Sequence, residues 1–242
     1  MLCLILKLEN KKLLDWSERM AIYAISDLHL SFGIEAKPMD IFGSHWSNYV
    51  EKIEKNWNQM IKEDDTVLMA GDFSWATYLE ESKADFEFLE KLPGQKIILK
   101  GNHDYWWTTL KKMNEFLEEN EFKSIKFLYN NVIEVEGYFV CGTRYWANED
   151  DCDNEKIYNR ECERAKISLN MAKSLDESKP IIFMTHYMPD ERIINCIAGF
   201  NVKCWIYGHI HSNYEENIAC VNGVETYLTS CDYLRFVPFK IA

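Results

Sequence analysis

The sequence predicts an α/β fold, because short apolar runs alternate with amphipathic stretches along most of the chain. The apolar runs are typical of strands buried on both faces of a sheet, and they cover residues 21–26, 66–70, 96–100, 180–185 and 204–208. The stretches between them have helical periodicity, and the clearest cover residues 49–61, 79–92, 110–117 and 157–175. A strand–helix–strand rhythm indicates a largely parallel sheet covered by helices.

Other segments predict antiparallel pairing, so we expect mixed sheets. Residues 127–135 and 138–142 are extended runs joined by Glu136-Gly137. Residues 218–221 and 224–229 flank Asn222-Gly223, which is a strong signal for a type I′ hairpin.

The chain has no internal repeat and no linker rich in proline, glycine or serine. We therefore expect one domain over residues 20–242. Met20 stands directly before the first expected strand. We interpret residues 1–19 as an N-terminal extension.

Composition and charge restrict the class of protein. Hydrophobic residues make up 47% of the chain and aromatic residues 14%, which is enough for a sizeable core. The net charge of −12 argues against stable nucleic-acid binding, which needs a basic surface. It does not exclude an enzyme that meets phosphate through bound cations, since metals reverse the local field.

The eight cysteines form no C-x-x-C pair, which argues against a structural zinc site. The apolar start at Leu2–Leu6 is too short to span a membrane and lacks the features of an export signal. We therefore expect reduced thiols, a cytoplasmic location and no membrane partner. The sequence does not predict an oligomeric state.

Residues able to bind metal follow all five apolar runs. Sites in open α/β sheets form beyond the carboxyl ends of the strands, so these side chains are expected to meet. Five of the six histidines belong to these clusters, and His45 is the exception. Unrelated core histidines would be scattered instead. The clusters read Asp27-Leu28-His29, Gly71-Asp72, Gly101-Asn102-His103-Asp104, His186 and Gly208-His209-Ile210-His211.

Taken in order, these motifs resemble the calcineurin-like metallophosphoesterase superfamily over residues 27–211. The resemblance implies a four-layer α-β-β-α sandwich of two mixed sheets flanked by helices. It also implies two metal ions with Asp72 as the bridging ligand. The first ion would be held by Asp27, His29, Asp72 and His211, and the second by Asp72, Asn102, His186 and His209.

Physical chemistry agrees with a shared carboxylate, because two cations about 3.5–4 Å apart repel each other strongly. Nitrogen and oxygen ligands without thiolate suit Mn, Fe, Zn, Co or Ni. We favour Mn or Fe.

The resemblance further implies hydrolysis of a phosphoester by a hydroxide that bridges the two metals. His103 would stabilise or protonate the leaving oxygen, and Asp104 would orient its ring and raise its pKa. The alternative for Asp104 is an N-cap of a helix that starts at Tyr105.

The sequence departs from the serine/threonine phosphoprotein phosphatase branch. It has Gly-Asn-His-Asp where that branch has Gly-Asn-His-Glu, and no arginine follows Gly71-Asp72 in the expected place. We therefore expect a phosphomonoester or phosphodiester of a small molecule or nucleotide as substrate. Candidate substrate contacts are Trp75 and Trp106 as stacking surfaces and Arg144 and Arg192 as phosphate ligands. Ordinary packing and surface exposure are the alternatives for these residues.

Three other functions remain open. A phosphodiesterase or nuclease would use the same metals. A protein-interaction scaffold on the same fold would be expected to lose ligands, whereas this chain keeps all of them. A mononuclear hydrolase of esters or amides would leave Asn102 or His186 without a role.

Overall fold

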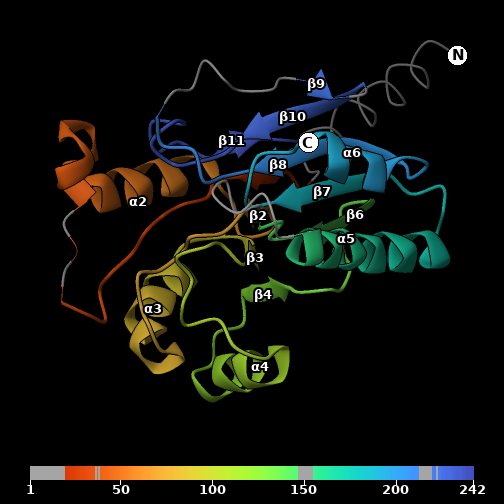
Figure 1. The fold of residues 1–242 in the computed structure, drawn as a ribbon. Helices are drawn as coiled ribbons and strands as arrows, with labels where there is room; N and C mark the ends of the chain where they lie inside the picture. Colours follow the sequence, from red (N-terminus) through yellow and green to blue (C-terminus); the bar gives the residue numbers. More distant parts are fainter. Residues whose placement is uncertain (1–19, 36, 38, 147–154, 213–219, 222) are drawn as a thin grey trace, which may run out of the picture.

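Two stacked β-sheets with helices on both outer faces form the protein in this computed structural model (Figure 1). The structure describes residues 20–35, 37, 39–146, 155–212, 220–221 and 223–242. The four-layer α/β sandwich expected from the sequence is confirmed. Residues 1–19, interpreted above as an extension, lie outside the described residues.

The first sheet has five strands in the order β11-β1-β2-β3-β4. The four strands from β1 to β4 are parallel to one another, and the edge strand β11 runs antiparallel to β1. The strands are β1 (Ile22–Ala24), β2 (Thr66–Met69), β3 (Gln95–Leu99), β4 (Ile125–Leu128) and β11 (Phe239–Lys240).

The second sheet has six strands in the order β5-β6-β7-β8-β10-β9. Its inner strands are parallel, and the edge strands β5 and β9 are antiparallel to their neighbours. The strands are β5 (Ile133–Val135), β6 (Tyr138–Thr143), β7 (Ile181–Thr185), β8 (Val202–Tyr207), β9 (Cys220–Val221) and β10 (Val224–Leu228).

Helices cover the outer face of each sheet. Side chains of α2 (Tyr49–Met60), α3 (Lys83–Lys91) and α4 (Leu110–Glu119) belong to the hydrophobic cluster against the first sheet. Those of α5 (Glu155–Leu175) and α6 (Glu191–Ile197) belong to the cluster against the second sheet. Single 3₁₀ turns occur at η1 (Met39–Phe42), η2 (Ser44–Trp46) and η3 (Leu79–Ser82). No described helix is long and apolar enough to cross a membrane.

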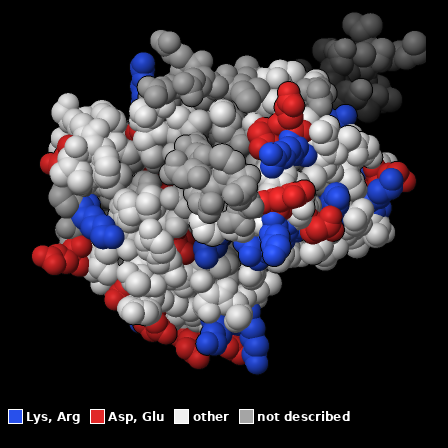
Figure 2. All heavy atoms as spheres, viewed as in Figure 1, with Lys and Arg blue, Asp and Glu red and all other residues white. Residues whose placement is uncertain are grey.

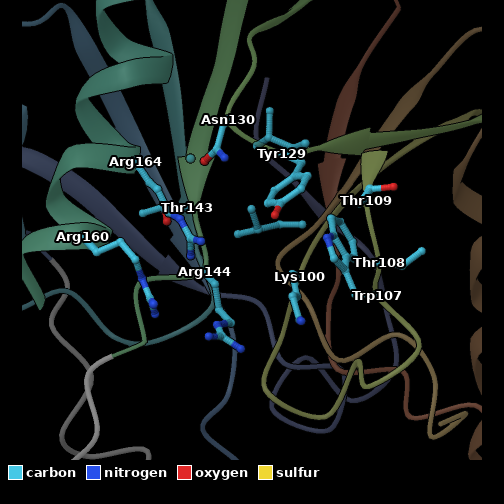
Figure 3. Close-up of a pocket in the computed structure, with 13 residues that line it drawn as sticks. Lys100, Trp107, Thr108, Thr109, Tyr129, Asn130, Thr143, Arg144, Arg160 and Arg164 are labelled. Atoms are coloured by element: carbon cyan, nitrogen blue, oxygen red, sulfur yellow. The ribbon is translucent and has the colours of Figure 1, made fainter. Parts of the chain in front are cut away.

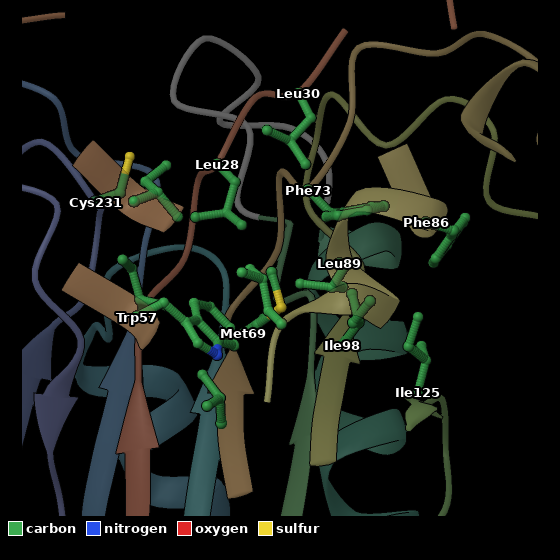
Figure 4. Close-up of a cluster of buried hydrophobic side chains, with 14 of the residues drawn as sticks. Leu28, Leu30, Trp57, Met69, Phe73, Phe86, Leu89, Ile98, Ile125 and Cys231 are labelled. Carbon is green, nitrogen blue, oxygen red and sulfur yellow. The ribbon is translucent and has the colours of Figure 1, made fainter. Parts of the chain in front are cut away.

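The alternation of side chains along β2 explains why the strand is apolar throughout. Val67 and Met69 face the helices, in the cluster drawn in Figure 4. Leu68 and the following Ala70 face the second sheet. Because successive side chains point to opposite faces and both faces are covered, every position is buried.

The prediction of a single strand over residues 127–135 is wrong. The chain forms β4 in the first sheet, turns, and forms β5 in the second sheet. Asn130 has a left-handed backbone with φ 55°, and the side chain of Asn131 accepts the Tyr129 N–H at 2.7 Å. This side-chain hydrogen bond stabilises a turn in the middle of an apolar run.

The hairpin expected between residues 218–221 and 224–229 is confirmed as the antiparallel pair β9 and β10. Gly223 has φ 82°, which the turn requires and which glycine adopts without strain. Asn222 lies outside the described residues.

Candidate metal centre

The ends of five parallel strands converge on one edge of the sandwich. The Asp27 N–H, after β1, donates to the carbonyl of Gly71, after β2, at 2.9 Å. The Gly208 N–H, after β8, donates to the carbonyl of His186, after β7, at 3.0 Å. The His209 N–H then donates to the Asp27 carboxylate at 3.0 Å, which links the two sheets at this edge.

Several candidate ligands have a left-handed backbone that their residue types seldom adopt. The φ angles are 58° at Asp27, 47° at His29, 53° at Asp72 and 72° at His209. Such conformations cost of order 1–3 kcal/mol each and cluster at functional sites. The chain also approaches itself closely here. A Cβ added at Gly101 would stand 2.0 Å from Asp72 Oδ1, so only glycine fits.

The first group of candidate ligands gathers around the two ring nitrogens of His29 and His211. Their Nε2 atoms are 3.3 Å apart. Asp27 Oδ1 lies 3.6 Å from His211 Nε2, and Asp72 Oδ2 lies 3.8 Å from His29 Nε2. Ligand atoms of Asp27, His29 and His211 all lie within 4.8 Å of one another, as a single metal ion requires.

The second group gathers around the amide oxygen of Asn102. Asn102 Oδ1 lies 2.6 Å from His186 Nε2 and 3.0 Å from His209 Nδ1. Asp72 Oδ2 lies 3.5 Å from His186 Nε2. Because the same Asp72 oxygen also approaches His29, its carboxylate lies between the two groups. All seven candidates from the sequence therefore come together.

Two imidazoles are oriented by hydrogen bonds on the side away from the site. His186 Nδ1 is 2.8 Å from the carbonyl of Ala70, an acceptor that requires the proton to be on Nδ1. His211 Nδ1 is 2.9 Å from Asp232 Oδ1. Each bond leaves Nε2 aimed at the site, which is how metal-binding histidines are positioned. Asp232 was missed in the sequence, although it follows the end of β10 and so obeys the rule that identified the other residues.

Three carboxylates are buried close together at this edge: Asp27, Asp72 and Asp104. Burial, with the charges of Asp104 and Asp27, raises the pKa of Asp72 well above its usual value. At Asp27 burial acts in the same direction, but the hydrogen bond and charge of His211 outweigh it, so the pKa is lowered. Clustered buried carboxylates are stable when cations compensate them.

Two imidazoles, those of His186 and His29, favour the same conclusion, whereas at His211 burial is outweighed by the carboxylates of Asp232 and Asp27, which raise its pKa to about 10. Burial lowers the pKa of His186 to about 3 and that of His29 well below its usual value, so both rings are neutral, as metal ligation requires. His29 Nδ1 is buried and has no hydrogen-bond partner among the described residues. Neutral imidazoles, carboxylates and an amide oxygen form a donor set that suits first-row divalent cations, so these residues fit a metal ion.

Residues 20–213 match the sequence pattern of the calcineurin-like phosphoesterase family. The chain belongs to this family. It is 29% identical over 136 residues to an uncharacterized protein of Methanocaldococcus jannaschii, a match that covers 54% of this chain and 72% of that protein. The family expected from the strand-end motifs is thereby confirmed.

Solved structures of bacterial proteins share the fold of this phosphoesterase. A protein of unknown function from Aquifex aeolicus has a TM-score of 0.52 at 21% identity, over 92% of this chain and 96% of that chain. A protein from Thermus thermophilus has a TM-score of 0.56 at 15% identity, over 88% and 89%. The phosphopantetheinyl hydrolase of Mycobacterium tuberculosis has a TM-score of 0.52 at 14% identity, over 92% and 96%.

In this phosphoesterase the carboxylate of Asp104 joins two motif loops. It accepts the N–H groups of Asp72 at 2.9 Å, Phe73 at 2.9 Å and Gly101 at 2.7 Å, and the indole N–H of Trp106 at 3.0 Å. These donors explain the position of Asp104 behind the site. Its expected role as the N-cap of a helix at Tyr105 is wrong, since α4 begins only at Leu110.

His103 follows the candidate ligand Asn102. Its ring lies 4.5 Å from the ring of Trp75, and its Nδ1 lies 3.4 Å from the Tyr105 hydroxyl. Burial and the charge of His209 lower its pKa. The expectation that Asp104 orients this ring and raises its pKa is therefore wrong, because that carboxylate is directed at backbone amides.

The candidate substrate contacts separate into different environments. Trp106 is only 2% exposed and packs in the core, and its contact with substrate stays a prediction. Trp75 is half-buried and stacks on His29 at 4.7 Å, as one wall of the site. The Arg144 guanidinium lies 4.6 Å from the centre of the Trp146 ring, and Arg192 on α6 lies 4.3 Å from that of Tyr158.

Proposed function

We propose that this chain is a binuclear metal-dependent phosphoesterase that hydrolyses a phosphomonoester or phosphodiester of a small molecule or nucleotide. The observation that carries the proposal is the position of the Asp72 carboxylate between two groups of ligand atoms. Membership of the calcineurin-like phosphoesterase family supports the reaction class.

The ligand assignment follows the two groups. We assign one cation to Asp27, His29, Asp72 and His211, and the other to Asp72, Asn102, His186 and His209. The contact of Asn102 Oδ1 with both His186 and His209 supports the second set. The donor types suit Mn, Fe, Zn, Co and Ni alike, and we propose Mn or Fe.

Two bound cations would lower the pKa of a water molecule and offset the negative charge of phosphate oxygens. The protein holds their ligands in place through groups behind the site. Asp104 fixes the backbone on both sides of Asp72, and Asp232 fixes the ring of His211. Such outer contacts hold ligands in one geometry, so that little reorganisation is needed during the reaction.

His103 is the candidate that would act on the leaving oxygen. Its lowered pKa keeps the imidazole neutral near pH 7, so its ring N–H acts as a hydrogen-bond donor to phosphate or leaving oxygen. The rings of Trp75 and Tyr105 limit the directions that this imidazole can take. We propose stabilisation of the leaving oxygen as its role.

The proposed location is the cytoplasm. All six cysteines that the structure describes are free thiols, as in proteins kept under reducing conditions. They are Cys141, Cys162, Cys196, Cys204, Cys220 and Cys231. The proposed partner is a phosphorylated small molecule or nucleotide.

The test is hydrolysis by the full chain after removal of metals and reconstitution with Mn, Fe, Zn, Co or Ni. The substrates are p-nitrophenyl phosphate, bis-p-nitrophenyl phosphate, nucleotides and phosphopeptides. We expect metal-dependent hydrolysis of a monoester or diester that is lost in Asp72→Asn and kept in Asp176→Asn, a control on the exposed surface. Absence of hydrolysis with every metal would overturn the proposal. Preference for the diester would favour the phosphodiesterase alternative.

A further inference from the structure

A cavity of about 380 Å³ opens beside the metal centre (Figure 3). The residues that line it come from the ends of β3, β4 and β6, from the loop before α4 and from α5. Its volume lies within the range of small-molecule sites. The lining includes Trp107 and Tyr129, whose rings are 5.8 Å apart, and the polar side chains of Thr108, Thr109 and Asn130.

Four basic residues line this cavity: Lys100, Arg144, Arg160 and Arg164. Lys100 and Arg144 follow β3 and β6, whereas Arg160 and Arg164 lie one helical turn apart on the same face of α5. Figure 3 shows the three arginines on one side of the cavity and Lys100 on the other. No described residue that lines the cavity is acidic, although the protein has a net charge of −12.

The counter-ion of Arg160 and Arg164 is the buried Glu161, and its carboxylate is heavily shared. It accepts a hydrogen bond from Arg164 at 2.7 Å and lies 3.6 Å from Arg160 Nε. It also accepts from the Thr143 hydroxyl at 2.9 Å and from the Tyr145 N–H at 3.1 Å. Asp104 is a second negative charge that acts on Lys100, and two carboxylates cannot neutralise four cations, so the cavity keeps an excess of positive charge.

Arg144 adds a second, independent indication. Its Nε atom is buried and has no hydrogen-bond partner among the described residues. A buried donor without an acceptor is unfavourable, and a charged one more so. An anion beside this guanidinium would offset that cost.

The cavity and the candidate metal centre share the end of β3 and are joined by one backbone hydrogen bond between the ends of β6 and β7. Lys100 directly precedes Gly101-Asn102, and the carbonyl of Arg144 accepts the N–H of His186 at 3.2 Å. These backbone links place the cavity lining next to the candidate ligands Asn102 and His186. In the view of Figure 2, basic side chains gather near the centre of this face, beside the end of α5.

We propose that the cavity binds a second phosphate group of the substrate, remote from the ester that is hydrolysed. The substrate class is thus a small organic molecule with two separate phosphate groups. This inference rests on the proposed phosphoesterase function, and it assigns the specificity of that site. Proteins bind phosphate with arginine guanidinium groups, which donate two parallel hydrogen bonds, and with lysine ammonium groups, and this cavity has both.

Binding is tested first. Metal-free protein is titrated with inorganic pyrophosphate, and the dissociation constant is measured by calorimetry. We expect Lys100→Gln and Arg160→Gln each to weaken binding about tenfold, the loss of one charge-assisted contact. Both positions are partly exposed, so the fold tolerates the change. The control Lys166→Gln removes one charge from α5 outside the cavity lining and should leave binding unchanged. Binding that is absent, or equal in all four proteins, would overturn the proposal.

Turnover is tested second, with alkanediol bisphosphates of increasing length against alkyl monophosphates. We expect a higher kcat/KM for a bisphosphate of matching length, lowered about tenfold in Arg160→Gln, with monophosphate hydrolysis unchanged. Pyrophosphate binding without any preference for bisphosphates would mean a site for free phosphate and overturn the substrate assignment. Hydrolysis of no ester at all would instead overturn the proposed function, and the binding data alone would then decide whether the cavity holds phosphate.

Discussion

Replacement of Asp232 by alanine should weaken metal binding although Asp232 is not itself a proposed ligand. Its fully buried side chain accepts from His211 Nδ1 at 2.9 Å. Burial acts against protonation of His211, but the carboxylates of Asp232 and Asp27 raise its pKa to about 10. Without Asp232, the ring loses the contact that directs Nε2 to the metal and makes it a stronger base.

The expected loss is about 10–100-fold in metal affinity, the range found when such an outer contact is removed. This corresponds to about 1.4–2.7 kcal/mol. The assay is competition for Mn²⁺ or Zn²⁺ between the protein and a fluorescent chelator. Asp232→Asn keeps an oxygen acceptor and should lose less affinity than Asp232→Ala. Asp176→Ala serves as the exposed control.

A dissociation constant for Asp232→Ala within about twofold of the wild-type value, in a variant that unfolds at the wild-type temperature, would refute this reasoning. It would mean that the position of His211 is set by the backbone alone. If the alanine and asparagine variants lost the same metal affinity, the charge of Asp232 and not its hydrogen bond would be the cause.

Three further predictions concern His103, Gly101 and Lys96. His103→Ala should lower kcat by about 100-fold and keep the two proposed metals in elemental analysis, since we propose that its ring acts on the leaving group; loss of the metals would contradict that role. Gly101→Ala should lower metal affinity, because its Cβ would stand 2.0 Å from Asp72 Oδ1. Gly137→Ala meets nothing within 4 Å and should keep its metal, although its φ of 82° strains alanine and should lower the melting temperature. Burial lowers the pKa of Lys96 to about 8 from 10.5, so the unfolded chain binds more protons between these values and the free energy of unfolding should rise by about 3 kcal/mol as pH increases across them. Chemical denaturation of wild type against Lys96→Met checks this, and a slope that persists in the variant would contradict it.

The sequence predicted where the candidate site lies because buried parallel strands are continuous apolar runs that are easy to identify. A strand such as β2 is apolar on both faces, so the polar residues after it stand out and mark the edge of the sheet. The same logic would have identified Asp232, which follows β10. It was overlooked because one carboxylate near the end of the chain forms no motif.

Other features depend on where the backbone turns and where side chains point, and the sequence pattern does not show either. The apolar run at residues 127–135 divides between two sheets because of a left-handed turn at Asn130. Asp104 looked like a partner for its neighbour His103, yet its carboxylate accepts from backbone amides of two loops. Trp106 follows the Gly101–Asp104 motif but packs inward. In each case tertiary contacts decide where the side chain points.

Of the basic residues that line the cavity, only Arg144 was predicted from the sequence as a phosphate ligand. Lys100, Arg144, Arg160 and Arg164 are separated by up to 64 positions, and none belongs to a recognisable basic motif. Only the packing of α5 beside the ends of β3 and β6 brings them together. A strongly acidic protein can therefore contain a local site for phosphate.

Metal content measured together with activity tests the central claim most directly. The metal-free chain is titrated with the activating metal, and bound metal per chain is determined by elemental analysis at each step. The binuclear assignment predicts that activity reaches its maximum only when two metal ions are bound to each chain. Full activity with one ion per chain would contradict it.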